Sequence, residues 1–302
     1  MSNRQAILHL GAHKTGTTAL QAFLARNTDL LSEKGFYYRP IGSRWRNHHE
    51  MVTGFHHGQS LGREVLQGLI RDCGDRTLLI SSEMLIEPFV DVDRFLRCLD
   101  GWNVRAIAYI RHPSDILVSA WNEVVRGYQS RWTAPIDAMP FPYDPGQFDL
   151  LAQWIGKTDL TLAPYDPRQW AGGSIFSDFL SMIGVDGRSF DYRREDGNES
   201  IAFPLAEALR LANMTIATPE QHAAIVAHLR TVECEPGPYP LKPESVEACL
   251  ERMREILPIY RSLYRPGFQE DFLLQPRHSG ATTTAGTAPI AAGSAMASGS
   301  PA

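Results

Sequence analysis

The sequence has few cysteines, no long apolar run and no large excess of charge of either sign. Its four cysteines, Cys73, Cys98, Cys234 and Cys249, lie far apart and form no C-x-x-C pair. This spacing argues against a zinc site and a dense disulfide framework, and it is typical of proteins in a reducing compartment. We therefore expect no zinc site.

No stretch approaches the roughly 20 consecutive apolar residues of a transmembrane helix. The N-terminal segment MSNRQAILHLGAHK lacks the charged n-region and long apolar h-region of a signal peptide. The formal net charge of −5 offers no basic excess for nucleic acid or for a polybasic membrane contact. We therefore expect a cytoplasmic protein without a membrane span and without a nucleic-acid partner.

What the sequence does contain is an alternation of apolar runs and helical patterns over the first 185 residues. The runs predict strands, and the patterns with apolar residues three and four apart predict helices. Such an alternation predicts an α/β fold, with a central parallel β-sheet flanked by helices on both faces. The expected strands are 6–10, 77–83, 104–110 and 160–165, and the expected helices are 17–31, 61–72, 91–99, 112–126 and 147–155. Residues 40–60 are expected to be an irregular surface segment.

The C-terminal part of the chain differs in pattern. Helical periodicity near 202–213, 219–232 and 243–263 predicts a helical part over about 200–275, and no long linker separates it from the sheet. We therefore predict a single domain over residues 1–275. Residues 276–302 are rich in Ala, Gly, Ser and Thr without an aromatic residue, which predicts a disordered tail.

The segment GAHKTGTTAL directly follows the first apolar run. Gly11 and Gly16 have the separation of a phosphate-binding P-loop, but Thr17 stands where that motif has its lysine, and Lys14 lies inside the loop. A glycine-bounded loop before a helix directs backbone N–H groups and the helix dipole at an anion. The spacing alone is also compatible with a tight strand-to-helix turn. A less highly charged anion than a triphosphate fits this loop better.

A second polar segment, YIRHPSDILVSAW, follows the strand expected over 104–110. Arg111 stands at its carboxyl end, and Ser119 follows eight residues later in the next helix. Because ligands of open α/β sheets bind at the carboxyl ends of the strands, we expect Arg111 and Lys14 to reach one crevice. A guanidinium suits a phosphate through bidentate contacts. Taken singly, Arg111 fits a surface ion pair and Ser119 an ordinary helix serine equally well.

These two segments resemble motifs of a known family. HKTGTT is similar to the 5′-phosphosulfate loop of sulfotransferases that use 3′-phosphoadenosine 5′-phosphosulfate, and YIRHPSDILVSAW is similar to their 3′-phosphate motif. Order and internal spacing match, and a looser likeness to bacterial members extends over much of residues 6–213. The resemblance implies a P-loop-type sheet and sulfuryl transfer to a hydroxyl of a glycan or small-metabolite acceptor.

The resemblance also implies roles for particular residues. Lys14 would neutralise charge on the bridging oxygen as the sulfuryl group leaves, without a metal ion. Contacts to the 5′-phosphosulfate would come from Lys14, Thr15, Gly16, Thr17 and Thr18, and contacts to the 3′-phosphate from Arg111 and Ser119.

The acceptor hydroxyl needs a base. Glu83, at the end of TLLISSE, is the first choice, because carbohydrate sulfotransferases of this fold use a glutamate near this strand. Small-molecule members use a histidine, so His13 and His48 stay open as alternatives. His48, His49 and Trp121 are also considered as acceptor contacts. If these residues have no functional role, Glu83 forms a structural salt bridge to a loop arginine, and the histidines belong to a solvated loop.

Two other functions remain open at this point. In a P-loop nucleotide kinase, LLISSE would serve as the Walker B strand, although the lysine after Gly16 is missing. A non-catalytic nucleotide-binding protein could have the same fold and bind the donor product without transferring a group. The sequence does not indicate an oligomeric state.

Overall fold

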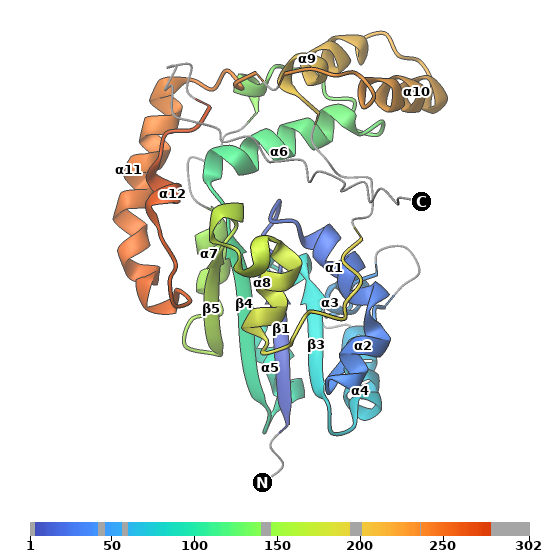
Figure 1. The fold of residues 1–302 in the computed structure, drawn as a ribbon, viewed down its shortest axis with the longest axis vertical. Coiled ribbons are helices and arrows are strands. Elements are labelled where there is room, and N and C mark those ends of the chain that lie inside the picture. The colour runs from blue at the N-terminus through green and yellow to red at the C-terminus, as the bar shows by residue number, and fades with distance from the viewer. Residues whose placement is uncertain are drawn as a thin grey trace, which may run out of the picture.

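A computed structural model describes residues 4–41, 46–55, 60–139, 146–193, 201–235 and 237–278. Five parallel strands form one sheet in the order β2-β3-β1-β4-β5 (Figure 1). The strands are β1 (Gln5–Leu10), β2 (Phe36–Tyr37), β3 (Thr77–Ser82), β4 (Asn103–Ile110) and β5 (Asp159–Pro164). The expected α/β class with a parallel sheet and flanking helices is confirmed, whereas a P-loop-type sheet stays a prediction.

The strands read as continuous apolar runs because helices cover both faces of the sheet. Along β1, Ala6, Leu8 and Leu10 face one core cluster, and Ile7 faces the other. Even His9 is buried on the second face, where its Nδ1 lies 2.8 Å from the Ser81 hydroxyl.

Each face has its own set of helices. On the first face lie α3 (His49–Thr53), α4 (Leu61–Cys73), α5 (Val92–Leu96), α7 (Gly146–Ala152), α11 (Pro243–Tyr260) and α12 (Asp271–Leu274). On the second face lie α1 (Thr17–Arg26), α2 (Thr28–Glu33) and α8 (Ile175–Met182). The helices that follow β1 and β3 thus lie on opposite faces, which places the carboxyl ends of these neighbouring strands at the topological switch point of the sheet.

A third group of helices lies beyond the carboxyl ends of the strands (Figure 1). It consists of α6 (Pro113–Arg126), α9 (Phe203–Ala212) and α10 (Pro219–Leu229), with the start of α11. Asn122 ties this layer together, because its amide donates to the Ile201 carbonyl and to the Tyr239 hydroxyl, both at 2.9 Å. The expected C-terminal helices are therefore confirmed: α9, α10 and the start of α11 form a cap over one end of the sheet, and the rest of α11 lies on its first face.

Three local expectations differ from the structure. The helix expected over 17–31 is interrupted at Asn27. The Asn27 side-chain amide donates to the Phe23 and Asp191 carbonyls, and such side-chain hydrogen bonds to the backbone compete with the continuation of a helix. The strand expected to end at 83 ends at Ser82, because Ser82 caps a 3₁₀ turn that begins at Glu83. The segment 40–60 contains the short helix α3, while 42–45 and 56–59 lie outside the described residues.

The last described residues lie at the start of the predicted tail, whose disorder stays a prediction. Arg277 and His278 both contact Asp115 in the first turn of α6, with His278 Nε2 at 2.9 Å from the carboxylate. Burial raises the pKa of Asp115, but the His278 hydrogen bond and the charge of Arg277 outweigh it and hold the pKa below its usual range. Ordered contacts therefore extend beyond residue 276, and 279–302 lie outside the described residues. That residues 1–275 form one domain stays a prediction.

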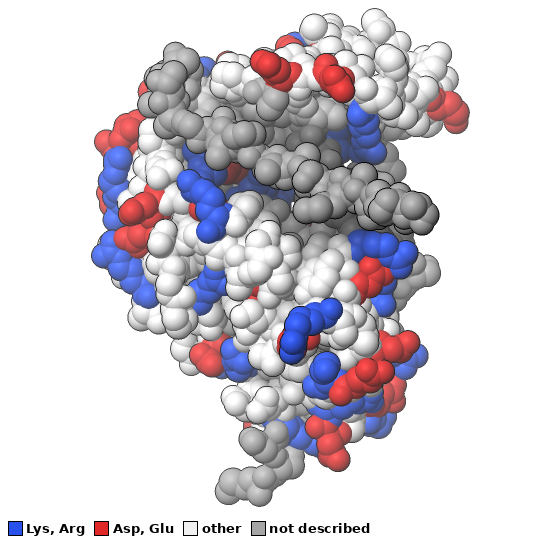
Figure 2. Space-filling model, in the orientation of Figure 1, with Lys and Arg blue, Asp and Glu red and all other residues white. Residues whose placement is uncertain are grey.

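Acidic and basic side chains are interspersed over the face that Figure 2 shows. Within the described ranges, no helix combines the length and the apolar character needed to cross a bilayer.

Candidate functional site

The loop between β1 and α1 is closely packed at both of its glycines. A Cβ on Gly11 would lie 2.7 Å from Thr17 Cγ2 and 2.9 Å from Glu83 Cγ. Gly16 has a φ of +71°, and a Cβ there would lie 2.9 Å from the Tyr165 hydroxyl. The loop therefore runs between the end of β3 and the end of β5, where side chains at these two positions would not fit.

The first turn of α1 is open to an anion. Gly16 precedes the helix without a capping side chain, and the first turn contains no acidic residue. Its leading N–H groups therefore have no capping side-chain acceptor. Thr18 is exposed, and Thr17 is 3% exposed. Thr15 is buried and its hydroxyl donates to the Ala12 carbonyl at 2.6 Å. Its contact with a 5′-phosphosulfate stays a prediction.

The structure brings Lys14 and Arg111 together, as the strand order requires. Arg111 Nη1 donates to the Lys14 carbonyl at 2.5 Å, and its guanidinium lies 5.1 Å from the centroid of the Tyr165 ring. Gln147 fixes the Arg111 backbone from both sides, by accepting from its N–H at 3.2 Å and donating to its carbonyl at 2.6 Å. The Lys14 ammonium pairs with Glu123 on α6.

Ser119 lies on the same helix as Glu123, one turn earlier. Asp115, Ser119, Glu123 and Arg126 follow one another at spacings of four, four and three residues, so they share one face of α6. The apolar residues of α6 pack on α9 and α11 instead. Ser119 is partly exposed, and in the described part of the chain no hydrogen bond joins it to Arg111.

His13 lies between two carboxylates at the ends of β1 and β3. Its Nε2 lies 2.6 Å from Glu87 Oε1, and its Nδ1 lies 3.5 Å from Glu83 Oε2. The hydrogen bond to Glu83 raises the pKa of His13 to about 9 against the opposing effect of burial, and Glu87 adds to the increase. His13 therefore carries a positive charge at neutral pH, while Glu83 remains partly exposed beside it.

His49 and His48 differ sharply in position. His49 is partly buried at the edge of this site and its Nδ1 lies 2.9 Å from the Ser82 hydroxyl. His48 is completely buried and its Nδ1 accepts from the Ser81 N–H at 3.1 Å. Burial lowers the pKa of His48 to about 4.

Two expected acceptor contacts are therefore corrected. His48 and Trp121 each have 0% exposure and offer no surface to a ligand. Trp121 packs in the cap and its indole donates to the Ala134 carbonyl at 3.3 Å. The expectation failed because an aromatic or imidazole ring beside a loop is equally suited to the core.

Three residues at this site were missed by the sequence reasoning. Glu87 follows Glu83 by four residues, and Tyr165 directly follows β5, so the strand-end rule could have found both. Glu123 carried no such signal, since its contact with Lys14 joins residues 109 apart in the sequence.

Within the described ranges, no group of three His, Cys, Asp or Glu side chains is arranged to hold a metal ion. Comparisons of the chain with protein-family models, with curated proteins and with solved structures found no match.

Proposed function

We propose that this protein transfers a sulfuryl group from 3′-phosphoadenosine 5′-phosphosulfate to a hydroxyl of a glycan or small-metabolite acceptor. The observation that carries the proposal is the contact between Arg111, after β4, and the Lys14 carbonyl, in the loop after β1. Two cationic side chains from separate motifs therefore lie beside the loop whose N–H groups point at an anion. A donor with two anionic ends, the 5′-phosphosulfate and the 3′-phosphate, requires two such cations. The motifs also have the order and spacing of the family that they resemble.

The residues present fit the 5′-phosphosulfate end of the donor. The uncapped first turn of α1 offers N–H groups to oxyanions, and Gly16 leaves the backbone accessible where a side chain would meet Tyr165. Lys14 is paired with Glu123, whose side chain is 60% exposed. Because an exposed ion pair contributes only about 0–1 kcal/mol, an anionic donor group can replace Glu123 at little cost.

The transfer itself needs no group beyond these side chains and the two substrates. The acceptor oxygen forms a bond to sulfur as the bond from sulfur to the bridging oxygen breaks, and adenosine 3′,5′-bisphosphate leaves. Lys14 neutralises the charge that develops on that bridging oxygen, and the hydroxyl proton passes to Glu83. A protonated His13 has no free lone pair, which supports Glu83 over His13 as the base.

The alternatives are less well supported. Thr17 stands where a P-loop kinase has the lysine that reaches the β- and γ-phosphates. A non-catalytic nucleotide-binding protein would bind the donor product yet transfer no sulfuryl group to any acceptor. An acceptor screen with labelled donor separates this last possibility from the enzyme.

Ligand-induced stabilisation tests the assignment of the donor. We expect adenosine 3′,5′-bisphosphate to raise the melting temperature more than ADP does, because only the bisphosphate has a 3′-phosphate. A ligand present at about 100 times its Kd stabilises the folded protein by roughly 2.7 kcal/mol. Arg111→Ala should remove the difference, because the guanidinium distinguishes the 3′-phosphate. Arg39→Ala, an exposed arginine paired with Asp72, is the control and should retain it. Equal stabilisation of the unmodified protein by the two nucleotides would refute the donor assignment.

Activity tests the role of Lys14. Lys14→Ala should lower the rate of sulfuryl transfer by about 10²–10³-fold or more, as expected for the loss of a group that stabilises developing charge. Lys157→Ala removes another surface ammonium, paired with Asp93 at 2.9 Å, and should leave the rate unchanged. A normal rate in Lys14→Ala would contradict the assigned role.

A further inference from the structure

Two carboxylates lie on either side of the His13 imidazole, and the proposed reaction uses only one of them. Glu83 opens the 3₁₀ turn Glu83–Ile86, and Glu87 directly follows that turn. His13 Nε2 donates to Glu87 Oε1 at 2.6 Å, whereas His13 Nδ1 lies 3.5 Å from Glu83 Oε2. The shortest contact of the imidazole therefore goes to a carboxylate that has no part in the proposed transfer.

The Glu83 side chain runs along the loop that follows β1. A Cβ on Gly11 would lie 2.9 Å from Glu83 Cγ, so the stem of Glu83 passes closely over the loop backbone before its carboxylate reaches His13. Within the described ranges, this carboxylate has no other hydrogen bond or ion pair. The direction of the Glu83 carboxylate therefore depends on where the imidazole is held.

Glu87 holds the imidazole from the opposite side. The Glu87 backbone is fixed, because its N–H donates to the Met84 carbonyl at 3.2 Å, and its side chain is partly buried. A carboxylate that accepts from one ring nitrogen sets the orientation of an imidazole, as the third member of a catalytic triad does. Two carboxylates of like charge would also move apart if no cation lay between them.

The charge of His13 fits this arrangement. The contact with Glu83 raises the pKa of His13 to about 9 against the opposing effect of burial, and Glu87 adds to the increase. From α3, His49 also acts on this group, and burial lowers the pKa of His49, so it adds no positive charge at neutral pH. When Glu83 takes the acceptor proton, it loses its charge, and Glu87 then remains as the anionic partner of a partly buried imidazolium.

We infer that Glu87 is a positioning residue of the proposed sulfuryl transfer: it holds the His13 imidazolium, which in turn directs the Glu83 carboxylate at the acceptor hydroxyl. The inference rests on the proposed function, which supplies the proton that Glu83 accepts. It goes beyond that function because it assigns Glu87 an effect on the rate without a contact to donor or acceptor. Glu87 therefore acts only through Glu83.

Proton NMR of the histidine rings tests this arrangement without any reaction. The His13 signal, identified by its loss in His13→Gln, should titrate near pH 9 in the unmodified protein. Glu87→Gln should lower the pKa of His13 by about one unit or more, because an anion beside the imidazolium is lost.

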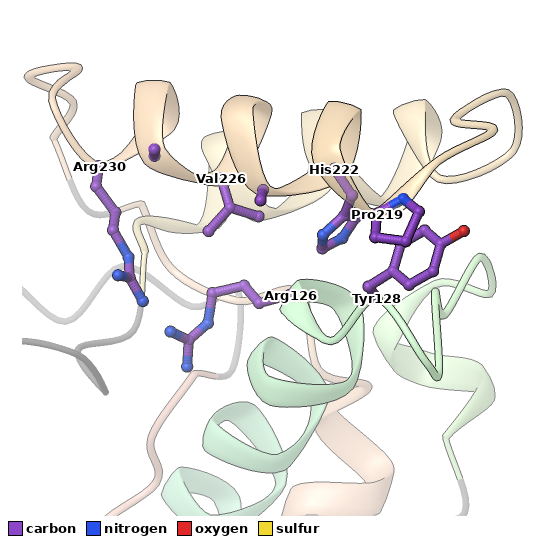
Figure 3. A pocket seen from close by; sticks show the side chains of 8 residues that line it. Arg126, Tyr128, Pro219, His222, Val226 and Arg230 are labelled. Carbon is purple, nitrogen blue, oxygen red and sulfur yellow. The ribbon is translucent and has the colours of Figure 1, made fainter.

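His222 is the internal control for this titration. It lines a groove in the cap, between α6 and α10 (Figure 3), and no Asp or Glu contributes to that lining among the described residues. Burial lowers the pKa of His222, and Glu87→Gln should leave its titration unchanged.

The rate of sulfuryl transfer tests the role of Glu87. Labelled donor with water as the acceptor reports the step without a natural acceptor, because the proton of the attacking water passes to Glu83 in the same way. At saturation with donor, Glu87→Gln should release labelled sulfate about 10–10²-fold more slowly, the cost of a misplaced group. In protein that already carries Glu83→Gln, the same change should have no further effect, because effects transmitted through one residue are not additive.

The controls separate this inference from the proposed function. Glu247→Gln removes an exposed carboxylate paired with Arg254 at 2.9 Å and should leave the rate unchanged. Affinity for adenosine 3′,5′-bisphosphate should be the same in all these variants, which also shows that they are folded. An unaltered rate in Glu87→Gln, an equal loss in both backgrounds, or a His13 pKa that does not respond to Glu87→Gln would refute the positioning role. If the unmodified protein does not bind the bisphosphate or does not cleave the donor, the proposed function fails instead.

Discussion

At the residue scale, His13 places a positive charge between two carboxylates of the site. Its imidazole lies between Glu83 and Glu87, and its pKa is raised from 6.5 to about 9, chiefly by the hydrogen bond to Glu83. A folded-state pKa above the unfolded value means that the charged histidine stabilises the fold. This stabilisation is fully present below about pH 6.5 and is lost as the pH rises through about 9.

Because the pKa of His13 is raised in the folded protein, the effect of His13→Gln should depend on pH. The unmodified protein should exceed the variant in free energy of unfolding at pH 6, and the difference should shrink steadily up to pH 10 because the imidazole loses its charge. Urea denaturation at several pH values measures it. His228→Gln, which changes an exposed histidine of α10, serves as the control variant. A pH-independent difference for His13→Gln would contradict the ion-pair arrangement.

At the scale of the element, the start of α1 depends on Gly16. Its φ of +71° is unfavourable for other residues, and a Cβ would meet the Tyr165 ring and hydroxyl at 3.0 and 2.9 Å. Tyr165 has little room to move, since Arg111 lies over its ring and Trp170 packs against it at 5.2 Å. The helix that presents its N-terminus to the site thus requires glycine for two separate reasons.

Gly16→Ala should therefore destabilise the protein by about 1–3 kcal/mol from backbone strain alone, with the contact to Tyr165 adding to this cost. Gly35→Ala is a matched control, because Gly35 has a φ of +83° but no atom within 4 Å of the added Cβ. The difference between the two variants in urea denaturation isolates the contact with Tyr165. Equal destabilisation would mean that the loop accommodates the methyl group freely.

At the scale of the whole molecule, a buried ion pair connects the C-terminal part to the sheet. Asp178 on α8 is fully buried and accepts from the Tyr109 hydroxyl at 2.8 Å and from Arg265 at 2.5 Å. The Arg265 backbone N–H also donates to the Leu162 carbonyl at 3.0 Å. The segment after α11 is thereby fixed to both β4 and β5.

We expect Arg265→Met to lower the free energy of unfolding by about 3–5 kcal/mol, because it leaves the Asp178 carboxylate buried with one partner fewer. If residues 1–275 unfold as one domain, circular dichroism and tryptophan fluorescence should report the same shifted transition. Arg188→Met breaks only an exposed pair and should cost at most about 1 kcal/mol. Two separate transitions would show that the helical C-terminal part is an independent unit.

Much of the fold could be predicted from periodicity. The parallel sheet, its buried strands and the helix from Pro113 to Arg126 follow from apolar runs and helical spacing in nearly the expected places. The two-residue strand β2 is too short to produce such a signal. The break at Asn27 was missed because side-chain hydrogen bonds to Phe23 and Asp191 decide it, and Asp191 lies far away in the sequence.

The sequence by itself determined that a glycine-bounded loop follows the first strand and that Lys14 and Arg111 stand at strand ends. The carboxyl ends of parallel strands lie along one edge of the sheet, so the sequence alone predicts that residues at these ends lie close together. Only the tertiary structure decided that Glu123 pairs with Lys14, that His13 lies between two carboxylates, and that His48 is buried. The physical reason is that periodicity tells which face of an element is apolar, while the partner of a polar side chain depends on which distant segments pack against it.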